Sequence, residues 1–338
     1  MVQLGHASPT VVIPAKAGTH SSACRERKWL HTNALLVPVA PSLLATCGGM
    51  GPGLRRDDTE CWMTRVTLRM EGTTMTTPLV TIDDVDMTYG GPGGTLAVEH
   101  LTMSVPEGEF VAVVGPSGCG KSTLMKLVTG LHIPEMGRIE VAGTHVTKPI
   151  SIVGMAFQNP TMLPWRTTID NVLLPLEIVR PHREQLRAKR AEYVAKAESL
   201  LELVGLKGFG EKYPWQLSGG MQQRANLCRA LIHEPRLLML DEPFGALDAF
   251  TREELWGVIR DIHADTHVTI VLVTHDLREA VYLADRVLVM SARPGRIVEE
   301  KIVPFERPRP MDIMYEREFS DVVSELRGHI AEARMEAA

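Results

Sequence analysis

The sequence predicts an α/β fold with a parallel sheet, an added antiparallel β subdomain and an inserted helical subdomain. Short, wholly apolar runs recur at "FVAVV", "LLML" and "TIVLV", with stretches of helical spacing between them. Two earlier runs, "LVTIDDVDMTY" and "LAVEHLTMSV", alternate apolar with polar residues. Strands buried on both faces are typical of parallel sheets, whereas alternation is typical of antiparallel strands with one solvated face.

The composition narrows the class of protein. The chain has 338 residues, of which 44% are hydrophobic, so it can bury the core of one large domain or two. Its formal net charge of −5 argues against binding nucleic acid by general phosphate attraction. No run of about 18 apolar residues predicts a membrane-spanning helix. The cysteines lack pairing and Cys-x-x-Cys spacing, which is typical of a reduced, cytosolic protein without a zinc site.

Residues 1–74 differ in character from the rest of the chain. They show no sustained periodicity and are broken by glycine and proline, which predicts disorder. Residues 25–47 have a second interpretation, because a basic start, an apolar stretch and Cys47 imitate an export signal. Two prolines in that stretch and its distance from the N-terminus argue against export. We expect a disordered leader, or an upstream extension of a chain that starts at Met75 or Met70.

The stretch "GPSGCGKST" follows the first apolar run and opens a helical one. This is the context that the phosphate-binding loop G-x-x-x-x-G-K-[ST] requires. Its N–H groups are expected to wrap a β-phosphate, while Lys121 reaches the β- and γ-phosphates and the Ser122 hydroxyl binds Mg²⁺. We interpret Cys119 as a tolerated small residue and not as a catalytic thiol. The loop residues expected to bind nucleotide are Gly115, Pro116, Ser117, Gly118, Cys119, Gly120, Lys121, Ser122 and Thr123.

A pair of acidic residues ends the second apolar run, "LLMLDEP". Asp241 is expected at the end of a buried strand, close to the Mg²⁺. Glu242 is then placed to polarise a water for attack on the γ-phosphate. Two adjacent acids are often only a solvated turn, but the phosphate loop upstream favours the catalytic interpretation. The sequence lacks the N-K-x-D element of a GTPase.

The stretch "LSGGMQQR" predicts a second anion site. Ser218 can cap a helix, and Gly219 and Gly220 allow a ligand to approach the backbone. An amphipathic run follows and stops at Pro235. The start of such a helix presents free N–H groups and a partial positive charge to an anion, although this one contains no lysine.

With these three motifs in this order, residues 75–296 resemble the ATP-binding subunits of ABC transporters. The resemblance implies that Tyr89 stacks on adenine and that Gln158, in the Q-loop, touches Mg²⁺ and the attacking water and senses the membrane partner. It also implies a D-loop that carries Asp248 and a switch histidine, His275, that holds the γ-phosphate. Each of these residues alone has an ordinary structural interpretation, but the ordered set makes that interpretation weak.

The resemblance also explains the second anion site. In this family two ATP-binding subunits pack head to tail, and each nucleotide lies between one subunit's phosphate loop and the other's "LSGG". Ser218, Gly219 and Gly220 are therefore expected to bind the γ-phosphate of ATP held mainly by the partner. The lysine is supplied from the other side, by Lys121 of that partner. A homodimer follows as an expectation.

Several loops resemble those of importers for nitrate, taurine and other sulfonates. They are "MLPWRTTIDNVLLPLE" and "SARPGRIVEE", together with Met221, where many members of the family have glutamine. The resemblance implies an ATP- and Mg²⁺-dependent motor, peripheral on the cytoplasmic face of the bacterial inner membrane. Its expected partners are two permease subunits and, indirectly, an extracytoplasmic solute-binding protein, without nucleic acid. The alternatives are an exporter motor, which these loops disfavour, and a soluble ABC ATPase of translation or DNA repair. A single ATPase unit and the acidic charge argue against the latter.

The expected boundaries follow the motifs. We expect the ATP-binding domain over residues 75–300, with the helical subdomain over about 162–234. Its segment 162–177 contains the apolar "MLPW", and we expect that segment to form a groove for a short permease helix. Residues 301–338 are predicted to be a proline-rich link and an amphipathic helix that packs on the domain and does not regulate it.

Overall fold

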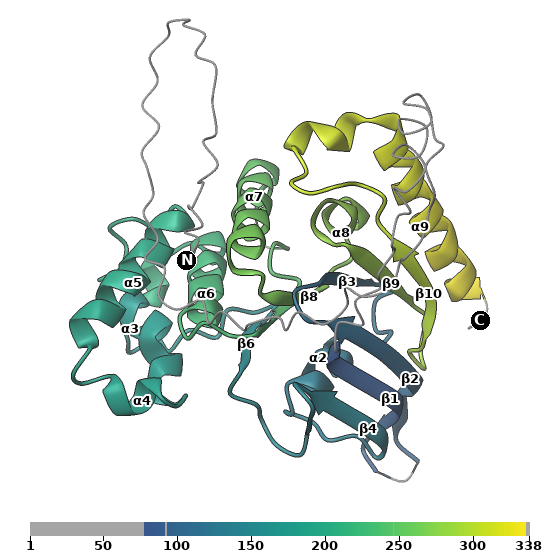
Figure 1. Cartoon of the computed structure of the whole chain (residues 1–338), viewed down its shortest axis with the longest axis horizontal. Coiled ribbons are helices and arrows are strands. Elements are labelled where there is room, and N and C mark those ends of the chain that lie inside the picture. The colour runs from purple at the N-terminus through teal and green to yellow at the C-terminus, as the bar shows by residue number, and fades with distance from the viewer. Residues whose placement is uncertain (1–77, 92, 246, 336–338) are drawn as a thin grey trace, which may run out of the picture. The chain divides into compact units, whose positions relative to one another are not determined.

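The computed structural model describes residues 78–91, 93–245 and 247–335, so the expected leader over 1–74 lies outside the described residues (Figure 1). The described strands form two sheets. The smaller sheet is antiparallel and has the order β2-β1-β4-β5. Its strands are β1 (Pro78–Tyr89), β2 (Thr95–Pro106), β4 (Met136–Val141) and β5 (Thr144–His145).

The larger sheet has the order β10-β9-β3-β8-β7-β6, and all its strands are parallel except β10. Every residue of its central strands β3, β7 and β8 is buried, as the continuous apolar runs predict. Alternate residues of β3 enter different cores, with Phe110 on one face of the sheet and Val111 on the other. Its strands are β3 (Phe110–Val114), β6 (Val153–Ala156), β7 (Leu237–Asp241), β8 (Thr269–Val273), β9 (Arg286–Met290) and β10 (Ile297–Ile302).

A group of helices interrupts the larger sheet between two of its neighbouring strands. The chain leaves the sheet after β6 and returns in β7, which pairs directly with β6. The helices between them gather at one side of the sheet in Figure 1. They are α3 (Thr168–Leu173), the 3₁₀ helix η1 (Leu174–Glu177), α4 (His182–Gln185), α5 (Arg190–Leu203), η2 (Pro214–Gln216) and α6 (Gly219–Leu231). Residues 162–167, with which we expected the helical subdomain to begin, precede α3 as a loop.

The remaining helices pack near the parallel sheet (Figure 1). Four helices begin at side-chain caps: Thr167 accepts from Asp170 N–H at α3, Ser218 from Met221 N–H at α6, Asp248 from Thr251 N–H at α7, and Asp276 from Arg278 N–H at α8. Within the described ranges, every helix is too short or too polar to span a lipid bilayer. The helices are α2 (Lys121–Val128), α7 (Ala249–Thr266), α8 (Leu277–Leu283), η3 (Met311–Tyr315) and α9 (Arg317–Met335).

Candidate functional site

Four segments that are far apart in the sequence meet at one edge of the parallel sheet. Strands β3, β8, β7 and β6 are neighbours in this order, so their carboxyl ends lie together. The phosphate loop follows β3, His275 follows β8, Glu242 follows β7 and Gln158 follows β6. Ligands of open α/β sheets bind at this edge. The topology therefore explains why these residues form one site.

The phosphate loop is shaped to present its backbone. Gly120 has a left-handed φ of 105°, and a Cβ atom there would lie 2.7 Å from Cγ1 of Val98. The N–H groups of Ser117 and Gly118 have no hydrogen-bond partner among the described residues. The loop therefore offers free donors to an anion.

The charge of Lys121 is held inside this loop. Its side chain is buried, and Nζ donates to the carbonyl oxygens of Gly115 and Pro116, at 2.9 Å each. The Sγ atom of Cys119 lies 3.7 Å from the same nitrogen. A buried ammonium next to free N–H groups favours an anionic ligand.

A hydroxyl and a carboxylate lie together at the start of α2. Ser122 Oγ donates to Oδ1 of Asp241 at 3.5 Å. Burial raises the pKa of the Asp241 carboxyl, and the Ser122 hydrogen bond opposes that shift. No group of three or more His, Cys, Asp and Glu side chains forms a metal site in the described part of the chain. One or two oxygen ligands from the protein are nevertheless enough for Mg²⁺, because this ion keeps several waters and also binds substrate phosphates.

The Glu242 carboxylate is held from two sides. Its Oε2 atom accepts from Gln158 Nε2 at 3.2 Å and lies 3.2 Å from His275 Nδ1. The Glu242 backbone has a left-handed φ of 45°, and its N–H donates to Val273 O at 2.9 Å. Such a conformation is strained in a residue other than glycine, and strain of this kind clusters at active sites. The arrangement holds a carboxylate at the carboxyl end of β7.

Tyr89 lies near the first turn of α2. Its hydroxyl is 3.3 Å from Thr123 Oγ1, and its ring packs edge-on against the imidazole of His132, with 5.4 Å between the centroids. These contacts place an aromatic ring next to the phosphate loop. Stacking on adenine stays a prediction.

The "LSGG" residues and Asp248 stand apart from this cluster. Ser218 is exposed, and its hydroxyl accepts only from Met221 N–H, at 3.3 Å. A Cβ atom added to Gly219 would meet nothing within 4 Å. Across the described ranges, no hydrogen bond or ion pair joins Ser218, Gly219 or Gly220 to the phosphate loop or to Glu242. The Asp248 carboxylate caps α7, and hydrogen bonds from Thr251 lower its pKa.

Polar residues inside α6 connect this helix to the Q-loop, and the sequence analysis missed them. Gln223 and Asn226 donate to the carbonyl oxygen of Phe157, at 3.3 and 3.1 Å. Arg229 donates to Thr161 O at 2.7 Å and to Asn226 Oδ1 at 2.6 Å. Burial lowers the pKa of the Arg229 guanidinium. The backbone next to Gln158 is thus hydrogen-bonded to the helix that carries Ser218.

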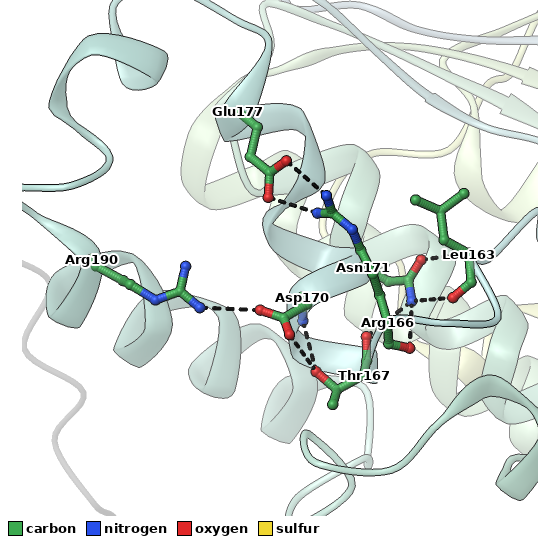
Figure 2. A network of polar contacts seen from close by, with 7 residues as sticks. All are labelled: Leu163, Arg166, Thr167, Asp170, Asn171, Glu177 and Arg190. Carbon is green, nitrogen blue, oxygen red and sulfur yellow. Dashed lines mark hydrogen bonds and ion pairs between the residues drawn. The ribbon is translucent and has the colours of Figure 1, made fainter.

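A second buried amide fixes the loop that follows the Q-loop. Figure 2 shows the side chain of Asn171 directed at the backbone of residues 163–167. Its Oδ1 accepts from Leu163 N–H at 2.7 Å, and its Nδ2 donates to the carbonyl oxygens of Leu163, Arg166 and Thr167. Arg166 also makes a two-fold ion pair with Glu177, at 2.6 and 3.0 Å. This loop carries Trp165, which is 71% exposed. The polar residues set among apolar ones in "TIDNVLL" are the feature of the sequence that indicates these hydrogen bonds.

Comparisons with known proteins agree with this geometry. A family model described as ABC transporter matches residues 98–245. The chain is 43% identical over 216 residues to an aliphatic sulfonates import ATP-binding protein of Bacillus licheniformis (64% of this chain and 80% of the relative). It is 40% identical over 245 residues to a nitrate import ATP-binding protein of Synechococcus elongatus (72% and 88%). It is 43% identical over 212 residues to a taurine import ATP-binding protein of Yersinia pestis (63% and 80%).

A solved structure shares the fold. It is an ATP-binding cassette described as a dimer in a post-hydrolysis state with ADP and phosphate bound. It is 28% identical to this chain, with a TM-score of 0.58, and it covers 67% of this chain and 100% of its own. The predicted α/β class of ABC type is thereby confirmed.

Proposed function

The chain belongs to the ABC transporter family as an ATP-binding subunit, and we propose that it drives the import of nitrate, taurine or other sulfonates. Its activity is the hydrolysis of ATP coupled to transport. The import direction is supported by the three relatives described above, whose names describe import. Nitrate, taurine and aliphatic sulfonates are all small solutes with an anionic oxygen group, which is the solute class we propose.

The observation that carries the catalytic proposal is the position of Glu242 between Gln158 and His275. Glu242 orients and polarises the attacking water, while Gln158 and His275 hold its carboxylate in place. The free N–H groups of the phosphate loop and the ammonium of Lys121 bind the phosphates.

Two oxygen ligands suit a metal ion next to the phosphates. Ser122 and Asp241 would hold Mg²⁺ there, and the ion would neutralise phosphate charge.

We propose that a second copy of the chain completes each nucleotide site. The start of α6 has an exposed serine cap and no contact with its own phosphate loop, so it is available to another subunit. In a two-fold dimer, Ser218, Gly219 and Gly220 of one subunit bind the γ-phosphate held at Lys121 of the other. The dimeric cassette among the solved structures supports this arrangement.

We propose that the surface around Trp165 receives a permease subunit. Trp165 is 71% exposed and Ile178 is 67% exposed, and the ion pair of Arg166 with Glu177 holds the backbone between them. A short cytoplasmic helix of the permease is the partner that such an apolar surface fits. Docking there places the subunit peripherally on the cytoplasmic face of the inner membrane, with the solute-binding protein as an indirect partner.

Affinity purification of the tagged full chain from the membranes of its source cells tests this function. We expect a multispanning permease to co-purify, and we expect the purified complex to hydrolyse ATP faster when the matching anion and its binding protein are present. Co-purification of ribosomes or DNA in place of a permease would contradict the proposal.

A further inference from the structure

The C-terminal helix α9 packs into the core with one face and lines a cavity with another. One face packs into the core through Phe319, Val322, Leu326 and Ala333. The next face, at the same helical spacing, carries Val323, Arg327, Ile330 and Arg334. All four side chains line a cavity, although Val323 and Ile330 are also partly buried against the core. The predicted packing role therefore accounts for only part of this helix.

The cavity lies between α9, the start of α8 and the phosphate loop. Its volume is about 540 Å³, and Ser117 and His275 form the wall nearest to the nucleotide site. Leu277, Val323 and Ile330 give it an apolar surface. It therefore borders the face that a second subunit must cover if the proposed dimer forms.

The cavity is also basic, because three arginines line it and its acidic residue, Asp276, pairs with Arg252. Arg278, Arg327 and Arg334 line it, and their guanidinium groups make no hydrogen bond or ion pair with any residue that the structure describes. In contrast, Glu325 on another face of α9 pairs with Lys301 at 2.7 Å. The cavity thus offers apolar contact together with positive charge.

The start of α7 carries an exposed side chain that is complementary to this cavity. Phe250 is 82% exposed, more than any other large hydrophobic residue of the described ranges, and it follows Asp248 of the D-loop. Glu254 lies one helical turn further on, is exposed, and makes no ion pair within the described part of the chain. An exposed phenylalanine beside a free carboxylate is complementary to an apolar cavity edged by arginine.

The first turn of α7, which carries Phe250, is linked through Arg252 to the wall of the cavity. Arg252 Nη1 lies 3.4 Å from Oδ2 of Asp276, which lines the cavity, and Arg252 Nη2 donates to Leu247 O at 3.2 Å. The start of α7 is therefore tied to the segment that carries His275. In a two-fold dimer the contacting surface of one subunit meets the same surface of the other, so every contact across the interface is reciprocal.

We propose that Phe250 of each subunit inserts into the cavity between α8 and α9 of the other when the ATP-bound dimer closes. This inference rests on the proposed dimer and extends it, because it makes α9 part of the interface. The aromatic ring contacts Leu277 and Ile330, an arginine of the cavity covers the ring, and Glu254 pairs with a second arginine. The occupant is a second copy of this chain.

Dimer formation in a chain with blocked hydrolysis provides the test. Full-length protein with Glu242→Gln is analysed by sedimentation with Mg-ATP, alone and combined with Phe250→Ser. We expect Phe250→Ser to weaken the dimer about tenfold or more, the effect typical of a buried aromatic anchor. Tyr315→Ser is the matched control, because Tyr315 is an aromatic residue with 75% exposure that lies outside the cavity. Binding of a fluorescent ATP analogue to the single subunits should stay unchanged.

A cross-link shows whether the contact is made between chains. One Glu242→Gln chain carries Phe250→Cys, and a second, tagged Glu242→Gln chain carries Ile330→Cys. Mild oxidation of the mixture is expected to give a disulfide between the two chains that depends on Mg-ATP. Mixtures in which only one chain has an introduced cysteine control for the native cysteines.

The outcomes separate this inference from the proposed function. If the Glu242→Gln parent dimerises with ATP, but Phe250→Ser has no effect and no mixed disulfide forms, the docking of Phe250 is wrong and the dimer stands. If the parent stays monomeric at saturating ATP, both proposals fail.

Discussion

The two predicted anion sites of this chain differ in how much of each site the chain itself supplies. At the phosphate loop, side chains from four strand ends contact one another: Ser122 binds Asp241, and Glu242 binds both Gln158 and His275. At the start of α6, the Ser218 hydroxyl has the N–H of Met221 as its single hydrogen-bond partner among the described residues. One site is assembled within the subunit, whereas the other presents donors outward.

The difference in charge has a physical consequence. Lys121 brings a buried ammonium to the phosphate loop, so this site can bind a nucleotide by itself. The start of α6 offers a hydroxyl, free N–H groups and a partial helix charge, which together bind an anion more weakly. It is therefore suited to a phosphate that another subunit already holds. This difference between a weak and a strong site is the basis for the proposal that dimer formation depends on ATP.

Removal of the Glu242 carboxylate gives the largest expected effect. Glu242→Gln should lower the rate of ATP hydrolysis by about 10²–10⁴-fold, because the amide keeps the size of the side chain but cannot act as a base. ATP affinity should stay within about twofold of the parent, since the phosphates are bound by the loop and Lys121. The hydrolysis rate and nucleotide binding are measured together, with Glu253→Gln as a control on α7. A rate within tenfold of the parent would show that the chemistry does not depend on this carboxylate.

Cross-linking of the helical subdomain to the permease is expected to give the next largest effect. In the complex with the permease, Trp165→Cys should cross-link efficiently to a cysteine placed in a cytoplasmic helix of that permease, because Trp165 stands exposed on a fixed loop. The matched control is Tyr315→Cys, at an equally exposed aromatic position far along the sequence. Efficient cross-links from Tyr315 alone would place the permease on another surface.

The buried amide of Asn171 should contribute to both stability and coupling. Asn171→Ala removes the side-chain hydrogen bonds to Leu163, Arg166 and Thr167, and leaves the Leu163 N–H and the Arg166 carbonyl without a partner among the described residues. We expect the free energy of unfolding to fall by about 1–3 kcal/mol. Transport should be lost to a greater degree than ATP hydrolysis, because the phosphate-loop cluster does not involve Asn171.

Chemical denaturation of Asn171→Ala and of the exposed control Asn159→Ala measures the stability effect. Transport and hydrolysis in vesicles measure the coupling. Equal losses of the two activities would indicate that Asn171 has only a structural role.

Deletion of residues 1–74 should have the smallest effect. Every residue proposed for either anion site lies between residues 89 and 275, and the first 74 residues show no core pattern. ATP hydrolysis, dimer formation and permease docking should therefore remain within about twofold of the full chain, since segments without an apolar pattern contribute little burial. The three activities are measured on both chains side by side. Loss of folding in the shortened chain would contradict this expectation.

The sequence allowed the contiguous parts of the site to be predicted, and the structure was needed for the connections between them. Lys121, Asp241 and Glu242 stand in short motifs at the ends of wholly apolar runs, where local pattern and topology agree. Gln158 and His275 were found only through the family resemblance, since a single polar residue after a strand has no pattern of its own.

The supporting polar residues were missed for a different reason. Asn226 and Arg229 read as part of the polar face of an amphipathic helix, but both are buried and bind carbonyl groups more than 60 residues away. Periodicity cannot show such partners, because it describes one element at a time. The same limit applies to the start of the helical subdomain: Asn171 holds residues 163–167 as a loop through contacts that a helical pattern does not reveal.

Size-exclusion chromatography with and without Mg-ATP tests the central claim, that the start of α6 completes the nucleotide site of another subunit. Glu242→Gln should elute as a monomer without nucleotide and as a dimer at saturating Mg-ATP, because unhydrolysed ATP bridges Lys121 of one subunit and Ser218 of the other. Adding Ser218→Arg should keep the protein monomeric by filling the start of α6, while each subunit still binds ATP. A Glu242→Gln protein that stays monomeric at saturating ATP, or a dimer that Ser218→Arg leaves unchanged, would contradict the account.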